Sequence, residues 1–169
     1  MTDYYLELTG IDWDSDGTEE IIEYHFPIAP EINETVQNNN TSVAGNDYLN
    51  TQVLPFGGQE KTINIIFFLR DDGSDRSNGT FGSSGISDSR ISDGTVETME
   101  EQRVYLDRYI NTGIIGKQLY LRGGRFEDPD GDGTVEGTPV RIDRLPIPDI
   151  AEEVTAKRVN LQLRVGQEV

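Results

Sequence analysis

Alternating apolar and polar side chains mark several short strands along the chain. The clearest alternation covers residues 154–165, where valine and leucine occupy one face and arginine, asparagine and glutamine occupy the other. Shorter runs of β-branched, leucine and aromatic residues predict further strands over residues 4–8, 20–26, 117–122 and 138–145. The chain is therefore expected to consist mainly of strands.

One further strand is apolar on both faces. Residues 61–69 (KTINIIFFL) place Ile63, Ile65 and Phe67 on one face, and the alternate positions are apolar as well. A strand with two apolar faces belongs in the centre of a sheet or in an interface between subunits. We therefore expect these three residues to anchor the core and to be candidates for an assembly interface.

A single helix is expected over residues 95–112. Thr98 and Glu101 have the spacing of a capping box at its start. Tyr105 and Tyr109 widen its apolar face, which should pack on a sheet. Because tyrosine buries a large area at low entropic cost, both are also candidates for interface anchors; the alternative is that they are half-buried residues of the fold.

Two polar segments interrupt these elements. Residues 31–50 read as an extended arm or loop, and residues 71–94 as a long polar loop of low complexity. The order of elements predicts a mainly β fold, a β-sandwich or barrel of six or seven strands with one α-helix packed on it. Residues 1–169 are expected to form a single domain.

The net charge of the chain indicates the salt concentration in which such a domain works. The chain has 31 acidic and 14 basic residues, only three of them lysine, and a net charge of −17. Self-repulsion of this size is screened in about 1 M salt, where the Debye length is roughly 3 Å. Charge spread evenly along the chain favours a salt-adapted surface over an acidic tail. Sequence-specific binding of nucleic acid is disfavoured, and no apolar run long enough for a membrane helix is present.

Catalytic chemistry has little support in the sequence. His25 is the only histidine, it falls in a strand expected to be buried, and there is no cysteine. Carboxylates occur in every loop, so no pair stands out as an acid and base. We expect the protein not to be an enzyme; a small hydrolase that depends on His25 or on a carboxylate pair is the weakest alternative.

One motif has the spacing of a calcium loop. Asp12, Asp14, Asp16 and Glu23, with Gly17, fit D-x-D-x-D-G-x5-E, in which short carboxylates converge on the ion. Strands flank the motif where an EF-hand has helices, and acidic turns produce such spacing by chance. Calcium is thus the one cofactor considered, and a calcium-dependent adhesion or surface-binding module is an alternative function. A second acidic stretch, residues 128–133, fits an ordinary hairpin turn better.

The order of the elements and the pattern of their residues resemble those of tail tube and distal tail proteins of tailed viruses. The resemblance rests on four segments: KTINIIFFL, TVETMEEQRVYLDRYI, PVRIDRL and AKRVNLQLRVG. It implies a structural protein that forms homo-oligomeric, hexameric rings, contacts other tail proteins and lets DNA pass through a channel. A distal tail, adaptor or tail terminator protein is the close alternative. With the salt signature, it implies a virus of a halophilic archaeon, assembly in the host cytoplasm and a place in the virion tail.

Overall fold

The strands and helices are defined by a computed structural model that describes residues 3–12, 17–27, 30–43, 52–77, 95–111, 118–150 and 155–166. The strands are β1 (Tyr5–Ile11), β2 (Glu20–His25), β3 (Glu31–Val43), β4 (Gln52–Arg70), β5 (Gln118–Arg122), β6 (Thr138–Arg144) and β7 (Ala156–Val165). The helical elements are α1 (Met99–Tyr105), the π-helical η2 (Leu106–Ile110) and the 3-10 turn η3 (Gly124–Phe126).

All seven strands belong to one antiparallel sheet in the order β2-β1-β5-β6-β7-β4-β3. The expected fold class, mainly β and barrel-like with one helix, is confirmed. β4 lies between β3 and β7, as its two apolar faces predicted.

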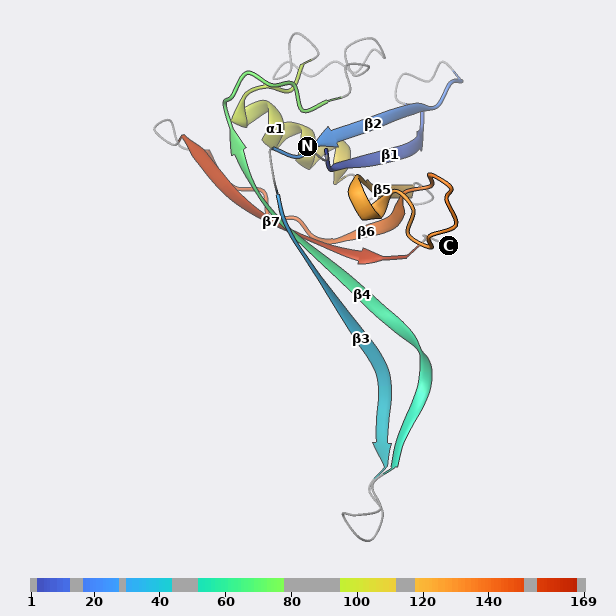
Figure 1. Ribbon diagram of the computed structural model, residues 1–169. Coiled ribbons are helices and arrows are strands. Elements are labelled where there is room, and N and C mark those ends of the chain that lie inside the picture. The colour runs from blue at the N-terminus through green and yellow to red at the C-terminus, as the bar shows by residue number, and fades with distance from the viewer. Residues whose placement is uncertain are drawn as a thin grey trace.

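The sheet is strongly curled. β2 and β4 are five positions apart in the strand order, a separation of about 24 Å in a flat sheet at about 4.8 Å per strand. Yet the ring centroids of Tyr24 and Phe67 lie 5.9 Å apart, and those of Phe26 and Phe67 lie 4.9 Å apart. The two ends of the sheet must therefore fold toward each other, and the helix packs where they meet (Figure 1).

Side chains on the concave face of the curled sheet form the core. Along β7, Val159, Leu161 and Leu163 are buried while the intervening residues are polar. Along β4, the buried positions are Ile63, Ile65, Phe67 and Leu69, with relative exposures between 0 and 2%. The alternation predicted from the sequence thus separates the residues of the core from those of the outer face.

The helix begins where the capping box predicted. Thr98 Oγ1 accepts from the Glu101 N–H, and the Glu101 carboxylate accepts from the Thr98 N–H at 2.8 Å. The α-helical part is shorter than expected, because residues 95–98 precede it and the chain widens into a π-helical turn from Leu106. The expected end of the helix, residues 112–113, lies outside the described residues.

Residues 31–43 of the arm expected over residues 31–50 form a strand of a β-ribbon and not a loop, and residues 44–50 lie outside the described residues. β3 pairs with β4 from Glu31↔Ile66 to Val43↔Gln52, so β4 begins nine residues before the strand predicted at Lys61. The ribbon projects far from the rest of the sheet (Figure 1). Asparagine, glycine and proline are poor strand formers, which is why their dense occurrence here suggested a loop.

Adjacent phenylalanines in β4 test the division into a core face and an outer face. Phe67 is 2% exposed and Phe68 is 44% exposed. Phe67→Ala is expected to lower the free energy of unfolding by about 3–5 kcal/mol, whereas Phe68→Ala is expected to change it by about 1 kcal/mol or less. Urea unfolding in molar KCl measures both. Equal losses of unfolding free energy in the two variants would show that the core is assigned to the wrong face of β4.

Candidate functional site

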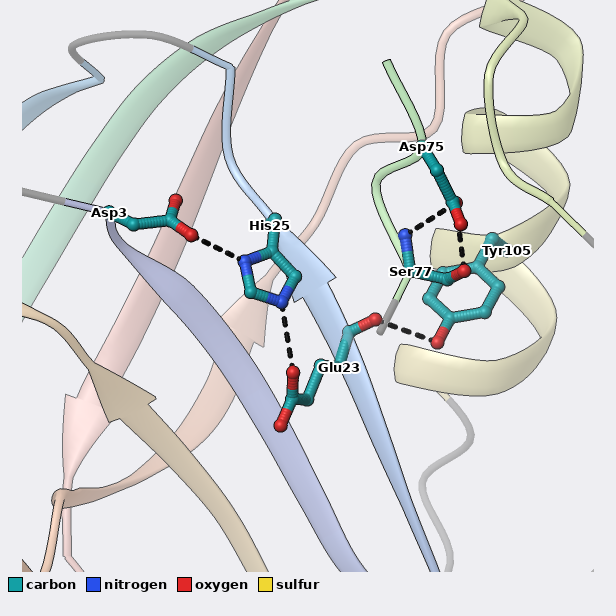
Figure 2. A network of polar contacts seen from close by, with 6 residues as sticks. All are labelled: Asp3, Glu23, His25, Asp75, Ser77 and Tyr105. Carbon is teal, nitrogen blue, oxygen red and sulfur yellow. Dashed lines mark hydrogen bonds and ion pairs between the residues drawn. The ribbon is translucent and has the colours of Figure 1, made fainter. Parts of the chain in front are cut away.

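The single histidine lies in a polar cluster on the outer face of β2 (Figure 2). His25 Nδ1 is 2.7 Å from an Asp3 carboxylate oxygen, and Nε2 is 2.9 Å from a Glu23 carboxylate oxygen. The ring stacks on Tyr5 with centroids 4.7 Å apart. The side chain is 23% exposed, so His25 is a partly buried strand residue that packs against a neighbouring strand. β2 places Glu23 and His25 on the same face because they are two residues apart.

This cluster does not have the geometry of a catalytic triad. Both ring nitrogens face carboxylates, and within the described part of the chain no hydroxyl contacts the ring. A base that activates a nucleophile needs one nitrogen directed at that nucleophile. The arrangement instead ties β1 to β2 through charge-assisted hydrogen bonds.

A second ion-pair group lies beside it. Arg122 donates to Glu7 at 2.8 Å and contacts Glu127 at 3.4 Å. Burial lowers the pKa of Arg122, but the hydrogen bond to Glu7 and the two carboxylates outweigh it, so the pKa is raised overall. Burial, followed by the charges of Glu127 and Glu23, raises the pKa of Tyr5. The ion pairs of Arg122 join β1, β5 and the following turn.

The calcium-loop candidates are only partly described. Asp12 accepts a hydrogen bond from the Gly17 N–H at 2.9 Å, which closes its own turn. Glu23, expected to complete the cage, contacts His25 instead. Asp14 and Asp16 lie outside the described residues. The two described carboxylates therefore each have a partner from the protein.

The second acidic stretch forms a compact turn between η3 and β6. Asp128 accepts hydrogen bonds from the N–H groups of Gly131, Asp132 and Gly133 at 2.7 to 3.1 Å. The bond from Gly133 contributes most to a lowered pKa for Asp128. Carboxylate oxygens of Asp128, Asp130 and Asp132 lie within 4.8 Å of one another. The turn's own backbone satisfies Asp128, in agreement with the hairpin-turn interpretation.

The five residues expected at an assembly interface lie in the core of the monomer. Ile63, Ile65 and Tyr105 are 0% exposed, Phe67 is 2% and Tyr109 is 7% exposed. Tyr105 donates its hydroxyl to the Glu23 backbone oxygen at 2.8 Å, and burial raises its pKa well above the ordinary value (Figure 2). Tyr105 and Tyr109 belong to the helical elements and pack in one core with the three residues of β4, so in the monomer these side chains present little surface to a partner.

Sequence reasoning missed a strap at the start of the segment predicted as a long polar loop, of which residues 78–94 lie outside the described residues. Asp75 accepts from the Ser77 N–H, the Ser77 hydroxyl and the Val96 N–H at 2.8 to 2.9 Å (Figure 2). The Arg76 backbone oxygen accepts from the His25 N–H at 2.7 Å, and Arg76 is 6% exposed. Residues 71–77 thus join β2 to the segment before the helix. Asp-x-Ser, a common side-chain turn, is the one signal that could have indicated it.

Two exposed surfaces are the remaining candidates for function. One is the projecting ribbon, where Val36 is 51% exposed. The other is the outer face of β4, β7 and β6, which carries Phe68 and several arginines. Both surfaces are better suited to contact with another molecule than to catalysis.

No family model matches the chain, and comparison with curated proteins gives no match. Among the described residues, no helix is long and apolar enough to span a bilayer.

The strap is tested by removing its central acceptor. Asp75→Ala leaves three donors without their partner and is expected to lower the free energy of unfolding by about 1–3 kcal/mol. Glu136→Ala, at an exposed loop carboxylate, is the control and should change it by about 0.5 kcal/mol or less. Chemical denaturation in molar KCl compares them; a native-like midpoint for Asp75→Ala would contradict the strap's role.

Calcium is tested by chelation. Because Asp12 and Glu23 already have protein partners, EDTA at matched ionic strength is expected to leave the melting temperature unchanged. Calcium and magnesium are then added back separately. A melting temperature that falls with chelator and is restored by calcium alone would establish a structural calcium site.

Proposed function

We propose that this chain is a structural subunit that assembles with copies of itself into rings. The rings form the tail tube of a tailed virus, or a ring adjoining it, and enclose a channel through which DNA passes. By resemblance to tail tube proteins, each ring has six subunits. The salt-adapted composition favours a virus of a halophilic archaeon, with assembly in the host cytoplasm and final location in the virion tail.

The observation that carries this proposal is the projecting ribbon. β7 pairs with β4 only from Thr62 onward, so the part of the ribbon beyond that point consists of two strands. A two-stranded hairpin alone is marginally stable in water, and a third strand or a packing surface is needed to stabilise it. At its base, Val36, Gln37 and Asn38 are all exposed. A neighbouring subunit would supply the missing packing surface.

The free edge of β3 supports the same function. β3 has β4 on one side and no strand on the other within the described residues. An unprotected edge of this length presents backbone donors and acceptors that favour pairing with another chain. In a closed ring every subunit offers the same edge to its neighbour, so the pairing ends without open aggregation.

The acidic surface fits a channel for DNA. With a net charge of −17, most of the surface repels phosphate, so a nucleic acid can move past it without being held. Both ring nitrogens of His25 face carboxylates, which also favours a structural role over a hydrolytic one.

Electron microscopy in molar KCl tests the proposal. Negative staining and mass measurement are expected to show rings, and stacking into tubes would identify a tail tube subunit. Single rings that do not stack would identify a distal tail, adaptor or terminator protein. A monomer that persists at high concentration would contradict the proposal.

Shortening the ribbon separates folding from assembly. Asn38 and Gln59 are register partners, so replacing residues 39–58 with Asn-Gly closes the hairpin in a favoured two-residue turn. The core lies elsewhere, so the variant should melt like the wild type but remain monomeric by light scattering.

The matched control replaces only the tip, residues 44–51, with Asn-Gly between the partners Val43 and Gln52. It retains the ribbon and should assemble. Assembly of the shortened variant at wild-type concentrations would show that the ribbon is not needed.

A further inference from the structure

The outer face of β6 and β7 has the opposite charge to the rest of the protein. The two strands contain five basic residues and one acidic residue, Asp143, in a chain with a net charge of −17. The basic residues are Arg141, Arg144, Lys157, Arg158 and Arg164. Charge is thus distributed unevenly, with a concentration of cations on one part of the sheet.

Strand register places four of these arginines on the face away from the helix. Arg164 is opposite Thr62 of β4 and Arg141 of β6, and Arg158 is opposite Phe68. Arg144 is opposite Gln162. We call Arg141, Arg144, Arg158, Arg164 and Phe68 the arginine face.

Carboxylates of the described residues neutralise only one member of the arginine face. Arg164 pairs with Glu60 at 3.1 Å and with Asp143 at 3.0 Å. Arg141, Arg144 and Arg158 are exposed and form no ion pair in the part of the chain that the structure describes. Like charges placed directly opposite on a sheet, as in Arg141 and Arg164, are destabilising. An external anionic partner would remove this cost.

The face also contains an apolar contact surface. Phe68 is 44% exposed, beside a shallow groove lined in part by Pro27, Pro30 and Ile66. Arginine next to an exposed aromatic ring is typical of the energetically important centre of a protein interface.

The acidic turn, residues 127–137, has the complementary properties. It contains five carboxylates and no basic residue (EDPDGDGTVEG). Its backbone is fixed by the hydrogen bonds to Asp128, while Asp130, Asp132 and Glu136 are exposed. Val135, 71% exposed, adds an apolar side chain. The turn therefore presents a preorganised anionic surface with one apolar contact.

We propose that the arginine face binds the acidic turn of a second copy of this chain, as one interface of the assembled ring; this inference rests on the proposed function. Guanidinium and carboxylate groups form short, often bidentate, hydrogen-bonded pairs. Such direct contacts are less affected than long-range attraction when the Debye length falls to about 3 Å in about 1 M salt. The contact is heterologous, and such a contact generates a ring when the rotation that relates neighbouring subunits closes.

Charge exchange tests the interface. Arg144→Glu/Arg158→Glu and Asp130→Arg/Asp132→Arg each place like charges across the contact. Each variant alone should need a concentration roughly tenfold or more above wild type to assemble in molar KCl. An equal mixture of the two variants should assemble at the wild-type concentration, because each then meets an opposite charge. Recovery in the mixture also shows that both variants are folded.

The control variant is Arg108→Glu/Lys157→Glu, which changes net charge equally at sites outside the arginine face and should assemble like the wild type. If the wild type assembles and both interface variants match it, this inference is overturned and the proposed function stands. If only the arginine variant fails and the mixture does not recover, the acidic turn is the wrong partner and the inference is overturned. If the wild type never assembles, both proposals fail.

Duplex DNA is the competing anion. Wild-type protein is therefore titrated with a short duplex in the same buffer. Binding that is lost in Arg144→Glu/Arg158→Glu, with assembly unchanged, would assign the arginine face to nucleic acid and overturn the inference.

Discussion

The aromatic contact between β2 and β4 is the constraint on which the rest of this structure depends. Tyr24, Phe26 and Phe67 meet although their strands are five positions apart in one sheet. That contact requires the sheet to curl, and the curl creates the concave face on which the helix packs. Because the apolar area buried there is the main favourable term in folding, the core and the curvature stabilise each other.

The curl also determines what remains for other molecules. Alternate residues of β4 from Ile63 to Leu69 and of β7 from Val159 to Leu163 belong to the core, so the opposite face of these strands remains available to a partner, as does the ribbon. The outer face combines Phe68 with exposed arginines, and the ribbon extends where no third strand supports it. The His25 ring lies between the carboxylates of Asp3 and Glu23, and among the described residues no hydroxyl contacts it.

Much of the fold could be predicted from the sequence, because its signals are local. The alternation in β7 and the capping box at Thr98 and Glu101 depend on near neighbours and are both present. The ribbon and the strap could not be predicted, since they depend on distant pairing: Asn-rich β3 is a strand only because β4 lies beside it. Likewise, the sequence identified Ile63 and Tyr105 as large apolar side chains but could not tell a monomer core from a subunit interface.

Hydrogen exchange of the ribbon tests most directly whether a neighbouring subunit completes it. Amides of β3 beyond Val36 and of β4 before Lys61 are compared in monomers and in assemblies formed in molar KCl, with the amides of β7 as the internal reference. We expect the ribbon amides to exchange fast in the monomer and to be strongly protected in the assembly, with the β7 amides protected in both. Equally fast exchange of the ribbon amides in assembled protein would show that no neighbouring subunit completes the ribbon.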